Sequence, residues 1–232
     1  MKNIIIIPGK YKPPHKGHLS LIEKLINKKS TSKIIVIISN KPISLDNNFT
    51  YMDQKPVELL KKSLIKYYPK KEVLINNMTK VELIKLINKY IVNKRLPSIS
   101  PEESLLIWNI YIKYLQRKYD IRSIDQNIQF VISKNNNVVI ETHKQVIKAF
   151  KEKPNMVILM KSAKNEYNTR FNFLEKVFGK YVKTMLFPNI KDIDSTKMRF
   201  YLLNNDKNGF MKFLPSDLEV MYKNKIWKIL KI

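Results

Sequence analysis

Short, unbroken apolar runs alternate with amphipathic stretches near the start of the chain. The first run, residues 3–7, holds four consecutive isoleucines and stops at Pro8-Gly9. A β-branched run of this length predicts a strand that is buried on both faces, as in a parallel sheet. Apolar residues at helical spacing follow from 17 to 28, and a second apolar run spans 33–39. Strand, helix and strand in that order form one right-handed crossover unit.

The same alternation returns in the second half of the chain. It predicts three further strands, at 127–133, 155–161 and 181–187, with helices between them at 141–151 and 168–178. Alternating strands and helices indicate an α/β fold, and we expect a Rossmann-like, doubly wound parallel sheet of about five strands.

The stretch from 43 to 98 interrupts this alternation. Helical patterns cover 56–67 and 79–92, and residues 72–75 form a possible strand. We interpret the stretch as a mainly helical insertion into the sheet domain. It could serve as a lid, as an acceptor-binding cap or as a dimer contact.

A long helix is predicted directly after the insertion. Ser100 can cap this helix, Pro101 suits its first turn and Glu103 completes a capping box, so we expect it to run to about residue 119. Residues 216–232 have the pattern of one more amphipathic helix. The predicted parts are a sheet domain of residues 1–42 and 98–205, a helical insertion of residues 43–97 and a C-terminal helical extension of residues 206–232.

Composition narrows the classes of function. The 232 residues are 44% hydrophobic, which allows a real core, and the chain has no cysteine, which excludes disulfides and cysteine-based zinc sites. The apolar runs are too short to cross a bilayer or to act as a signal sequence. We therefore expect a cytoplasmic protein without a membrane partner.

The formal net charge of +25 would attract polyanions such as nucleic acid or nucleotides. The lysines, however, are spread along a chain rich in Lys, Asn and Ile, which A- and T-rich codons encode, and we favour coding bias as their explanation. Nucleic acid is therefore not an expected partner, although the charge leaves it open. A basic surface would still help to collect phosphorylated substrates.

The segment from Pro8 to His18 is the candidate catalytic centre, because it follows the carboxyl end of the first strand, where ligands bind in open α/β sheets. Gly9 allows close backbone approach to a ligand. Gly17 and His18 open the next helix, whose N-terminal amides favour phosphate. His15 and His18 are three residues apart, so both imidazoles can donate to one phosphate whose charge grows in a transition state. The alternative is that one histidine only caps the helix or packs.

A second candidate segment, residues 193–199, follows the last predicted strand. Ser195 or Thr196 can cap a helix there, and the free amides, the hydroxyls, Lys197 and Arg199 could then converge on one anion. The alternative is an ordinary capped surface helix.

A third and weaker patch follows the fourth predicted strand, from 162 to 170. Lys164 and Arg170 are its candidate phosphate contacts, and the alternative is that both are solvated loop charges.

The first segment resembles the nucleotidyltransferase superfamily that carries the HxGH ("HIGH") signature, G-x-F-x-P-x-H-x-G-H. The positions that match are Gly9, Pro13, His15, Gly17 and His18, while Tyr11 replaces the phenylalanine and Lys12 stands where many relatives have Asp, Asn or Gln. The sequence of residues 12–18, Lys-Pro-Pro-His-Lys-Gly-His, is most similar to that of cytidylyltransferase-like proteins of phages and large DNA viruses. If the protein is viral, we expect it in the host cytoplasm. The second segment resembles the superfamily's I-S-S-T-x-x-R signature, in which Ser195, Thr196 and Arg199 match and Asp194 replaces a small hydroxyl residue.

The resemblance implies transfer of a nucleotidyl group from a nucleoside triphosphate to a small phosphorylated acceptor, with release of pyrophosphate. Adenylyl transfer to nicotinamide mononucleotide is the first expectation, and cytidylyl transfer to a sugar- or alcohol-phosphate is the alternative. The implied cofactor is Mg²⁺ with ATP, or with CTP, held mainly by the phosphates and not by a protein metal site. The implied catalytic residues are His15, His18, Lys12 and Arg199, and the implied nucleotide- or phosphate-binding residues are Gly9, Lys10, Tyr11, Gly17, Lys164, Arg170, Ser195 and Thr196.

Two other classes compete with this interpretation. A catalytically silent, basic nucleic-acid-binding protein would explain the charge but leaves both signatures unused. A relative of aminoacyl-tRNA synthetases would share the two signatures, but the chain is short for a catalytic core with an anticodon domain. A homo-oligomer is compatible with all three interpretations.

Overall fold

The computed structural model describes residues 3–120, 127–134, 137–162, 171–187 and 193–231. Its centre is a five-stranded sheet with the strand order β5-β2-β1-β6-β7, in which every neighbouring pair is parallel. The strands are β1 (Asn3–Gly9), β2 (Thr31–Ile38), β5 (Ile128–Ile132), β6 (Val157–Ser162) and β7 (Val182–Phe187). Strand order runs outward in both directions from β1, so the predicted Rossmann-like, doubly wound fold is confirmed.

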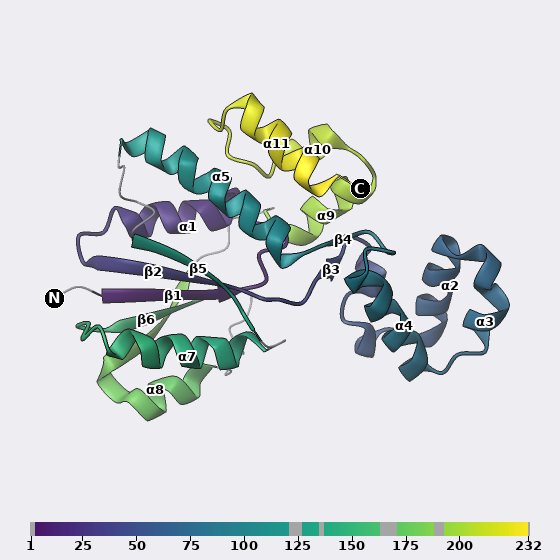
Figure 1. Cartoon of the computed structure of the whole chain (residues 1–232), viewed down its shortest axis with the longest axis horizontal. Helices are drawn as coiled ribbons and strands as arrows, with labels where there is room; N and C mark the ends of the chain where they lie inside the picture. The colour runs from purple at the N-terminus through teal and green to yellow at the C-terminus, as the bar shows by residue number, and fades with distance from the viewer. Residues whose placement is uncertain (1–2, 121–126, 135–136, 163–170, 188–192, 232) are drawn as a thin grey trace.

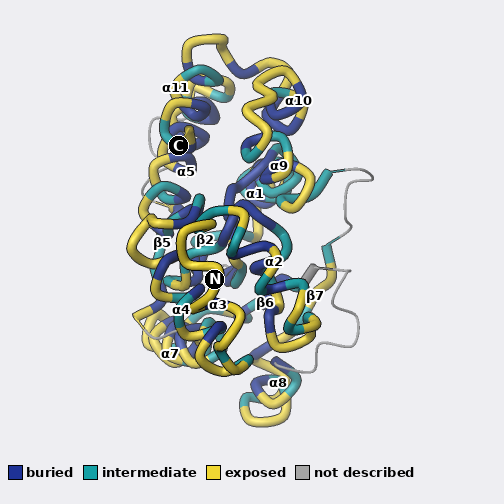
Figure 2. Tube along the Cα trace, turned by 90° about the vertical axis from the view of Figure 1, so that its right-hand side faces the viewer, coloured by how far each residue is buried: buried dark blue, intermediate teal, exposed yellow. Residues whose placement is uncertain are grey.

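Helices cover both faces of the sheet (Figure 1). Helices α1 (Lys16–Ile26) and α5 (Pro101–Tyr119) lie on one face, and α7 (Val138–Phe150) and α8 (Asn172–Phe178) lie on the other. The isoleucine run of β1 explains why both faces are covered, because its side chains alternate between two separate buried cores. Figure 2 shows the result, with buried residues along the strands and exposed residues on the outer sides of the helices.

The predicted start of α5 is confirmed in atomic detail. The Ser100 side chain accepts a hydrogen bond from the backbone N–H of Glu103 (3.1 Å), and the Glu103 carboxylate accepts one from the backbone N–H of Ser100 (2.7 Å). This reciprocal pair satisfies amides that have no partner inside the helix.

The stretch that interrupts the alternation forms a helical unit with its own buried core. Its helices are α2 (Val57–Tyr67), α3 (Glu72–Asn76) and α4 (Lys80–Val92), and its short 3₁₀ turns are η1 (Asn47–Phe49), η2 (Met52–Gln54) and η3 (Pro69–Lys71). An antiparallel pair of two-residue strands, β3 (Ile43–Ser44) and β4 (Ser98–Ile99), joins it to the sheet. Figure 1 shows α2, α3 and α4 beyond the carboxyl ends of the sheet strands, on the side where ligands bind in such folds.

The prediction of a possible strand at 72–75 is wrong, because these residues form the helix α3. Val73 and Leu74 are 77% and 55% exposed, and only Ile75 is buried, so the apolar run does not lie between two packed faces. In the described part of the chain no strand lies beside this segment to offer backbone partners, whereas a helical turn that continues η3 satisfies its own backbone groups.

The C-terminal part packs as three helices, α9 (Ser195–Leu203), α10 (Lys207–Met211) and α11 (Val220–Leu230). The predicted terminal helix therefore begins at Val220 and not at 216. An ion pair between Arg117 of α5 and Glu219 (2.9 Å) ties the start of α11 to the sheet domain. Among the described residues, none of the helices has the length and apolar character that a membrane span requires.

Replacing Ser100 by Ala removes the cap of α5 and should lower the free energy of unfolding by about 1 kcal/mol. Urea denaturation followed by circular dichroism measures the change. Ser30→Ala, at an exposed serine in the turn before β2, is the matched control and should leave the value unchanged. Equal effects of the two substitutions would contradict the capping role.

Candidate active site

Tyr11 turns back over the end of β1. Its hydroxyl donates to the carbonyl oxygen of Ile7 (3.1 Å), and its buried ring packs edge-on against the His18 ring, with 4.9 Å between centroids. A Cβ atom on Gly9 would lie only 2.5 Å from the Tyr11 ring. The close approach that Gly9 permits in this structure is therefore to the Tyr11 ring.

Three successive carbonyl groups of the loop after β1 accept hydrogen bonds from side chains of other elements. The Pro13 carbonyl accepts from Ser195 Oγ (3.0 Å), and the Pro14 carbonyl accepts from the Tyr111 hydroxyl on α5 (3.3 Å). The third acceptor is the Lys12 carbonyl oxygen, which accepts a hydrogen bond from Arg199 Nη1 (3.0 Å). Two consecutive prolines have no N–H groups of their own, so the surrounding fold fixes the loop.

The two histidines lie at the start of α1 with their rings stacked, 3.7 Å apart and tilted by 20°. His15 is the N-cap residue, and its Nδ1 accepts a hydrogen bond from the backbone N–H of Gly17 (3.2 Å). The Nδ1 of His18 accepts one from the backbone N–H of His15 (3.2 Å). Because each Nδ1 is an acceptor, each neutral ring carries its proton on Nε2, which makes Nε2 the donor atom for a ligand.

The charge state of His18 follows from its surroundings. Burial lowers the pKa of His18 well below its usual value, and the adjacent His15 lowers it further. His18 is therefore neutral near pH 7 and can act as a hydrogen-bond donor without carrying a charge.

Lys12 is almost completely buried, with 1% of its surface exposed. Its ammonium donates hydrogen bonds to the carbonyl oxygens of Ser39 and Lys41, just after β2. Burial lowers the pKa of Lys12 to about 7, with Glu102 acting in the opposite direction and Lys10 in the same direction. The Lys12 ammonium is thus engaged with backbone groups between the ends of β1 and β2.

The prediction that Ser195 or Thr196 caps α9 is wrong, because Asp194 is the N-cap residue. Its carboxylate accepts a hydrogen bond from the backbone N–H of Lys197 (2.7 Å), and a charged acceptor binds this amide more strongly than a hydroxyl would. The two hydroxyls therefore serve other partners: Ser195 bonds to the loop after β1, and Thr196 Oγ1 accepts from Arg199 Nη2 (3.1 Å).

Arg199 joins the two signatures, although it lies 187 residues from Lys12 in the sequence. Its side chain is 5% exposed, and besides Lys12 and Thr196 it contacts Asn47 Oδ1 of η1 through Nη2 (3.4 Å). Its Nε atom is buried and has no hydrogen-bond partner among the described residues. Burial lowers the pKa of Arg199, while Asp194 and Tyr51 act in the opposite direction, and an arginine remains charged even so. A buried guanidinium with an unused donor favours an anionic ligand.

The remaining predicted residues are placed as follows. Lys10 is exposed, and its Nζ lies 4.7 Å from the centroid of the Tyr51 ring. Lys164 and Arg170 lie outside the described residues. Sequence reasoning missed Asn47 and Tyr51, because no motif marks either residue within the insertion.

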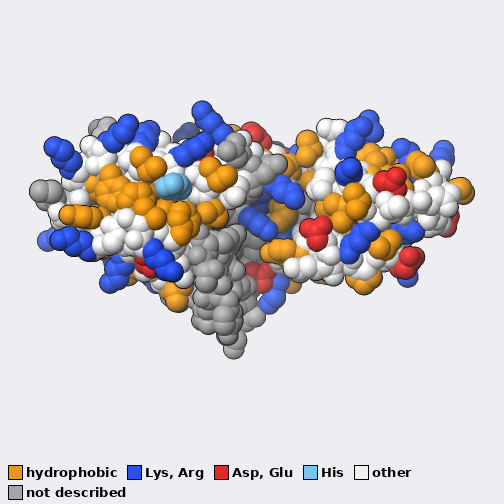
Figure 3. Space-filling model, turned by 90° about the horizontal axis from the view of Figure 1, so that it is seen from below, with side chains coloured by type: hydrophobic (Ala, Val, Ile, Leu, Met, Phe, Trp, Pro, Cys, Tyr) orange, Lys and Arg blue, Asp and Glu red, His pale blue; other side chains and the backbone are white. Residues whose placement is uncertain are grey.

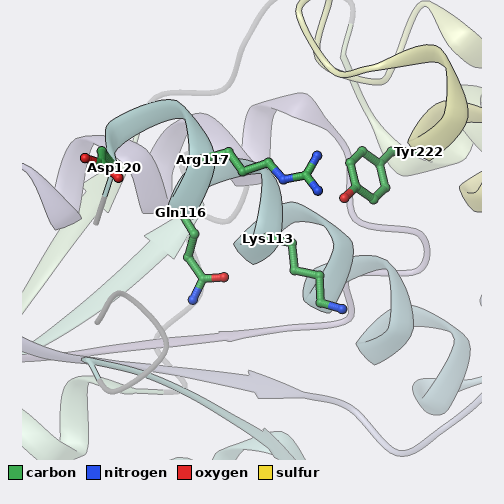
Figure 4. Close-up of a pocket in the computed structure, with 5 residues that line it drawn as sticks. All are labelled: Lys113, Gln116, Arg117, Asp120 and Tyr222. Carbon is green, nitrogen blue, oxygen red and sulfur yellow. The ribbon is translucent and has the colours of Figure 1, made fainter. Parts of the chain in front are cut away.

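The pocket in Figure 4 lies elsewhere, between α5 and α11. It is lined by Lys113, Gln116, Arg117, Asp120 and Tyr222, and the Arg117 guanidinium extends toward the Tyr222 ring. None of the signature residues lines this pocket. In the described part of the chain, no group of three or more His, Asp or Glu side chains is arranged to hold a metal ion.

Comparison with known proteins connects this geometry to an activity. No family model matches the chain. The chain is 32% identical over 136 residues to phosphopantetheine adenylyltransferase of Mycoplasma capricolum subsp. capricolum, a match that covers 54% of this chain and 92% of the relative. Among solved structures it is similar to Plasmodium falciparum nicotinic acid mononucleotide adenylyltransferase complexed with NaAD. That match has a TM-score of 0.49 and 14% identity, and it covers 99% of this chain and 98% of the other.

The depressed pKa of His18 has a consequence for stability. The unfolded chain protonates its histidines near pH 6.5, as free histidine does, whereas the folded chain keeps His18 neutral. The unfolded state therefore binds more protons below about pH 6.5, and the free energy of unfolding should fall as the pH falls through that range.

Urea denaturation at pH 7.5 and at pH 5.5 measures this change, and His18→Gln should remove part of it. Nuclear magnetic resonance of the His18 ring gives a direct check. A ring that titrates with an ordinary midpoint near pH 6.5 would contradict the buried, neutral state.

Proposed function

This chain belongs to the nucleotidyltransferase superfamily that carries the HxGH signature, and we propose that it transfers the adenylyl group of ATP to a small phosphorylated acceptor. The predicted enzyme class, a nucleotidyltransferase, is confirmed by this membership. One observation carries the proposal for the site: Arg199 of the second signature binds the backbone of Lys12 within the first. This contact supports the proposal that both signatures line one site at the carboxyl end of the sheet.

His15 and His18 act on the α-phosphate in this proposal. A phosphate oxygen of the acceptor attacks the α-phosphorus in line, the bond to the β-phosphate oxygen breaks, and pyrophosphate leaves. The Nε2–H groups of the stacked pair donate to oxygens whose negative charge grows during this step. No covalent enzyme intermediate forms, so the mechanism requires no Ser or Cys nucleophile.

The start of α9 binds the β- and γ-phosphates in this proposal. The unpartnered Nε of Arg199, which lies on this helix, offers a donor to a phosphate oxygen. Lys10 lies near Tyr51 at the exposed side of the same site and contributes a further cation. These groups hold the triphosphate while its α-phosphate reacts.

Mg²⁺ would accompany the triphosphate at this site, held by phosphate oxygens and water. When bound, the ion supplies positive charge that offsets the charge of the triphosphate.

The acceptor has two leading candidates. The Mycoplasma relative is named for phosphopantetheine, and the signature resemblance points to nicotinamide mononucleotide. Cytidylyl transfer to a sugar- or alcohol-phosphate stays the alternative. The cytoplasmic location, the oligomeric state and the phage or large-virus type stay predictions.

A pyrophosphate-release screen tests the proposed function. It combines ATP, CTP, GTP and UTP with phosphopantetheine, nicotinamide mononucleotide and glycerol phosphate. We expect release that depends on ATP, on Mg²⁺ and on one acceptor. Absence of release from every pair, together with tight DNA binding that weakens steeply with salt, would favour the silent nucleic-acid-binding alternative.

Replacing either histidine of the pair by Ala should lower kcat by about 100-fold or more, because each substitution removes a donor to the charged transition state. His143→Ala is the matched control, since His143 lies on α7 and packs against Phe173 of α8 (5.8 Å between centroids), in the layer opposite α1. The control should keep wild-type turnover. Wild-type turnover of His15→Ala or His18→Ala would refute the mechanism, and thermal unfolding of each variant checks that it remains folded.

A further inference from the structure

Tyr51 of the insertion lies beside the candidate triphosphate site. Its ring faces the Nζ of Lys10 from the first signature, at 4.7 Å from the centroid. Tyr51 is also close enough to Arg199 to affect the pKa of its guanidinium. Four residues earlier, Asn47 contacts the guanidinium of Arg199 directly (3.4 Å). The segment from Asn47 to Tyr51 therefore forms a wall beside both signatures.

The backbone of Tyr51 is held in an unusual conformation. Its φ angle of 53° lies in the left-handed region, which bulky side chains rarely adopt. Among the described residues other than glycine, the aromatic ones with a positive φ are Tyr11 and Tyr51, and both lie at this site. Strain of this kind collects at functional sites, where it places a side chain in a required position.

The Tyr51 side chain is directed outward. It is 67% exposed, and in the described part of the structure its hydroxyl makes no hydrogen bond. Packing therefore does not explain why a tyrosine stands here. The hydroxyl is available as a hydrogen-bond donor to a ligand.

The charges around Tyr51 define the ligand as an anion. Neither Lys10 nor Arg199 takes part in an ion pair within the described residues. Figure 3 shows Lys and Arg side chains in the hollow between the sheet domain and the inserted helices. Lys10 lies over the Tyr51 ring, and Arg199 contacts Asn47 four residues earlier, so both cations lie beside the same segment.

We propose that Tyr51 is a triphosphate-binding residue whose hydroxyl donates a hydrogen bond to a phosphate oxygen held between Lys10 and Arg199. This inference rests on the proposed function and deepens it, because it makes the insertion part of the nucleotide site. Asn47 supports the same site by holding the Arg199 guanidinium in place. The cation–π contact with Lys10 keeps the Tyr51 ring beside the first signature.

Binding of MgATP to Tyr51→Phe tests the inference, measured by isothermal titration calorimetry. The Phe variant keeps the ring and its contact with Lys10 but loses the hydroxyl, so the Kd should rise about tenfold, as for a lost hydrogen bond to a charged group. Tyr51→Ala should bind at least as weakly as Tyr51→Phe. Tyr181→Phe is the matched control, because Tyr181 is 53% exposed and has Lys180 Nζ over its ring at 5.6 Å. The control should bind MgATP like the wild type.

Wild-type affinity of Tyr51→Phe would overturn the inference, whatever Tyr51→Ala does, since the hydroxyl would then play no part. Wild-type protein that binds MgATP and releases pyrophosphate would keep the proposed function intact in that case. Wild-type protein that binds no triphosphate would instead refute the proposed function itself. Equal thermal unfolding temperatures of the wild type and Tyr51→Phe would show that a change in Kd does not arise from unfolding.

Discussion

The candidate site depends on the hydrogen bond between the guanidinium of Arg199 and the carbonyl oxygen of Lys12. The loop after β1 contains consecutive prolines, so it cannot satisfy its carbonyl groups with amides of its own. Arg199 and Ser195 of α9, together with Tyr111 of α5, supply the missing donors. The same contacts hold the start of α9 against the loop before α1, so the two signature segments lie next to one another.

The electrostatics of the site follow from this arrangement. Arg199 is buried and forms no ion pair with a carboxylate of the described residues, and such a charge is costly unless an anion pairs with it. His18, by contrast, is held in its neutral form, so it adds a donor without adding another charge. The combination suits a ligand whose negative charge is spread over several phosphates and concentrates at one of them during reaction.

Elements that depend on local pattern could be predicted from the sequence, and contacts between distant segments could not. The isoleucine run of β1 and the Ser100 cap of α5 are local signals, and the structure confirms both. Asp194 replaced the expected hydroxyl cap of α9, because several side chains competed for one amide and only the folded geometry decides among them. Tyr51 carries no sequence signal, since its position depends on how the insertion packs against the sheet domain.

The most direct test of the proposed triphosphate site is a crystal structure of the protein with magnesium and a non-hydrolysable ATP analogue. The α-phosphate should lie at the Nε2 atoms of His15 and His18, and the outer phosphates should lie at Nε of Arg199 and the hydroxyl of Tyr51. A nucleotide bound in the pocket between α5 and α11, with Arg199 Nε still unpartnered, would contradict the proposed triphosphate site.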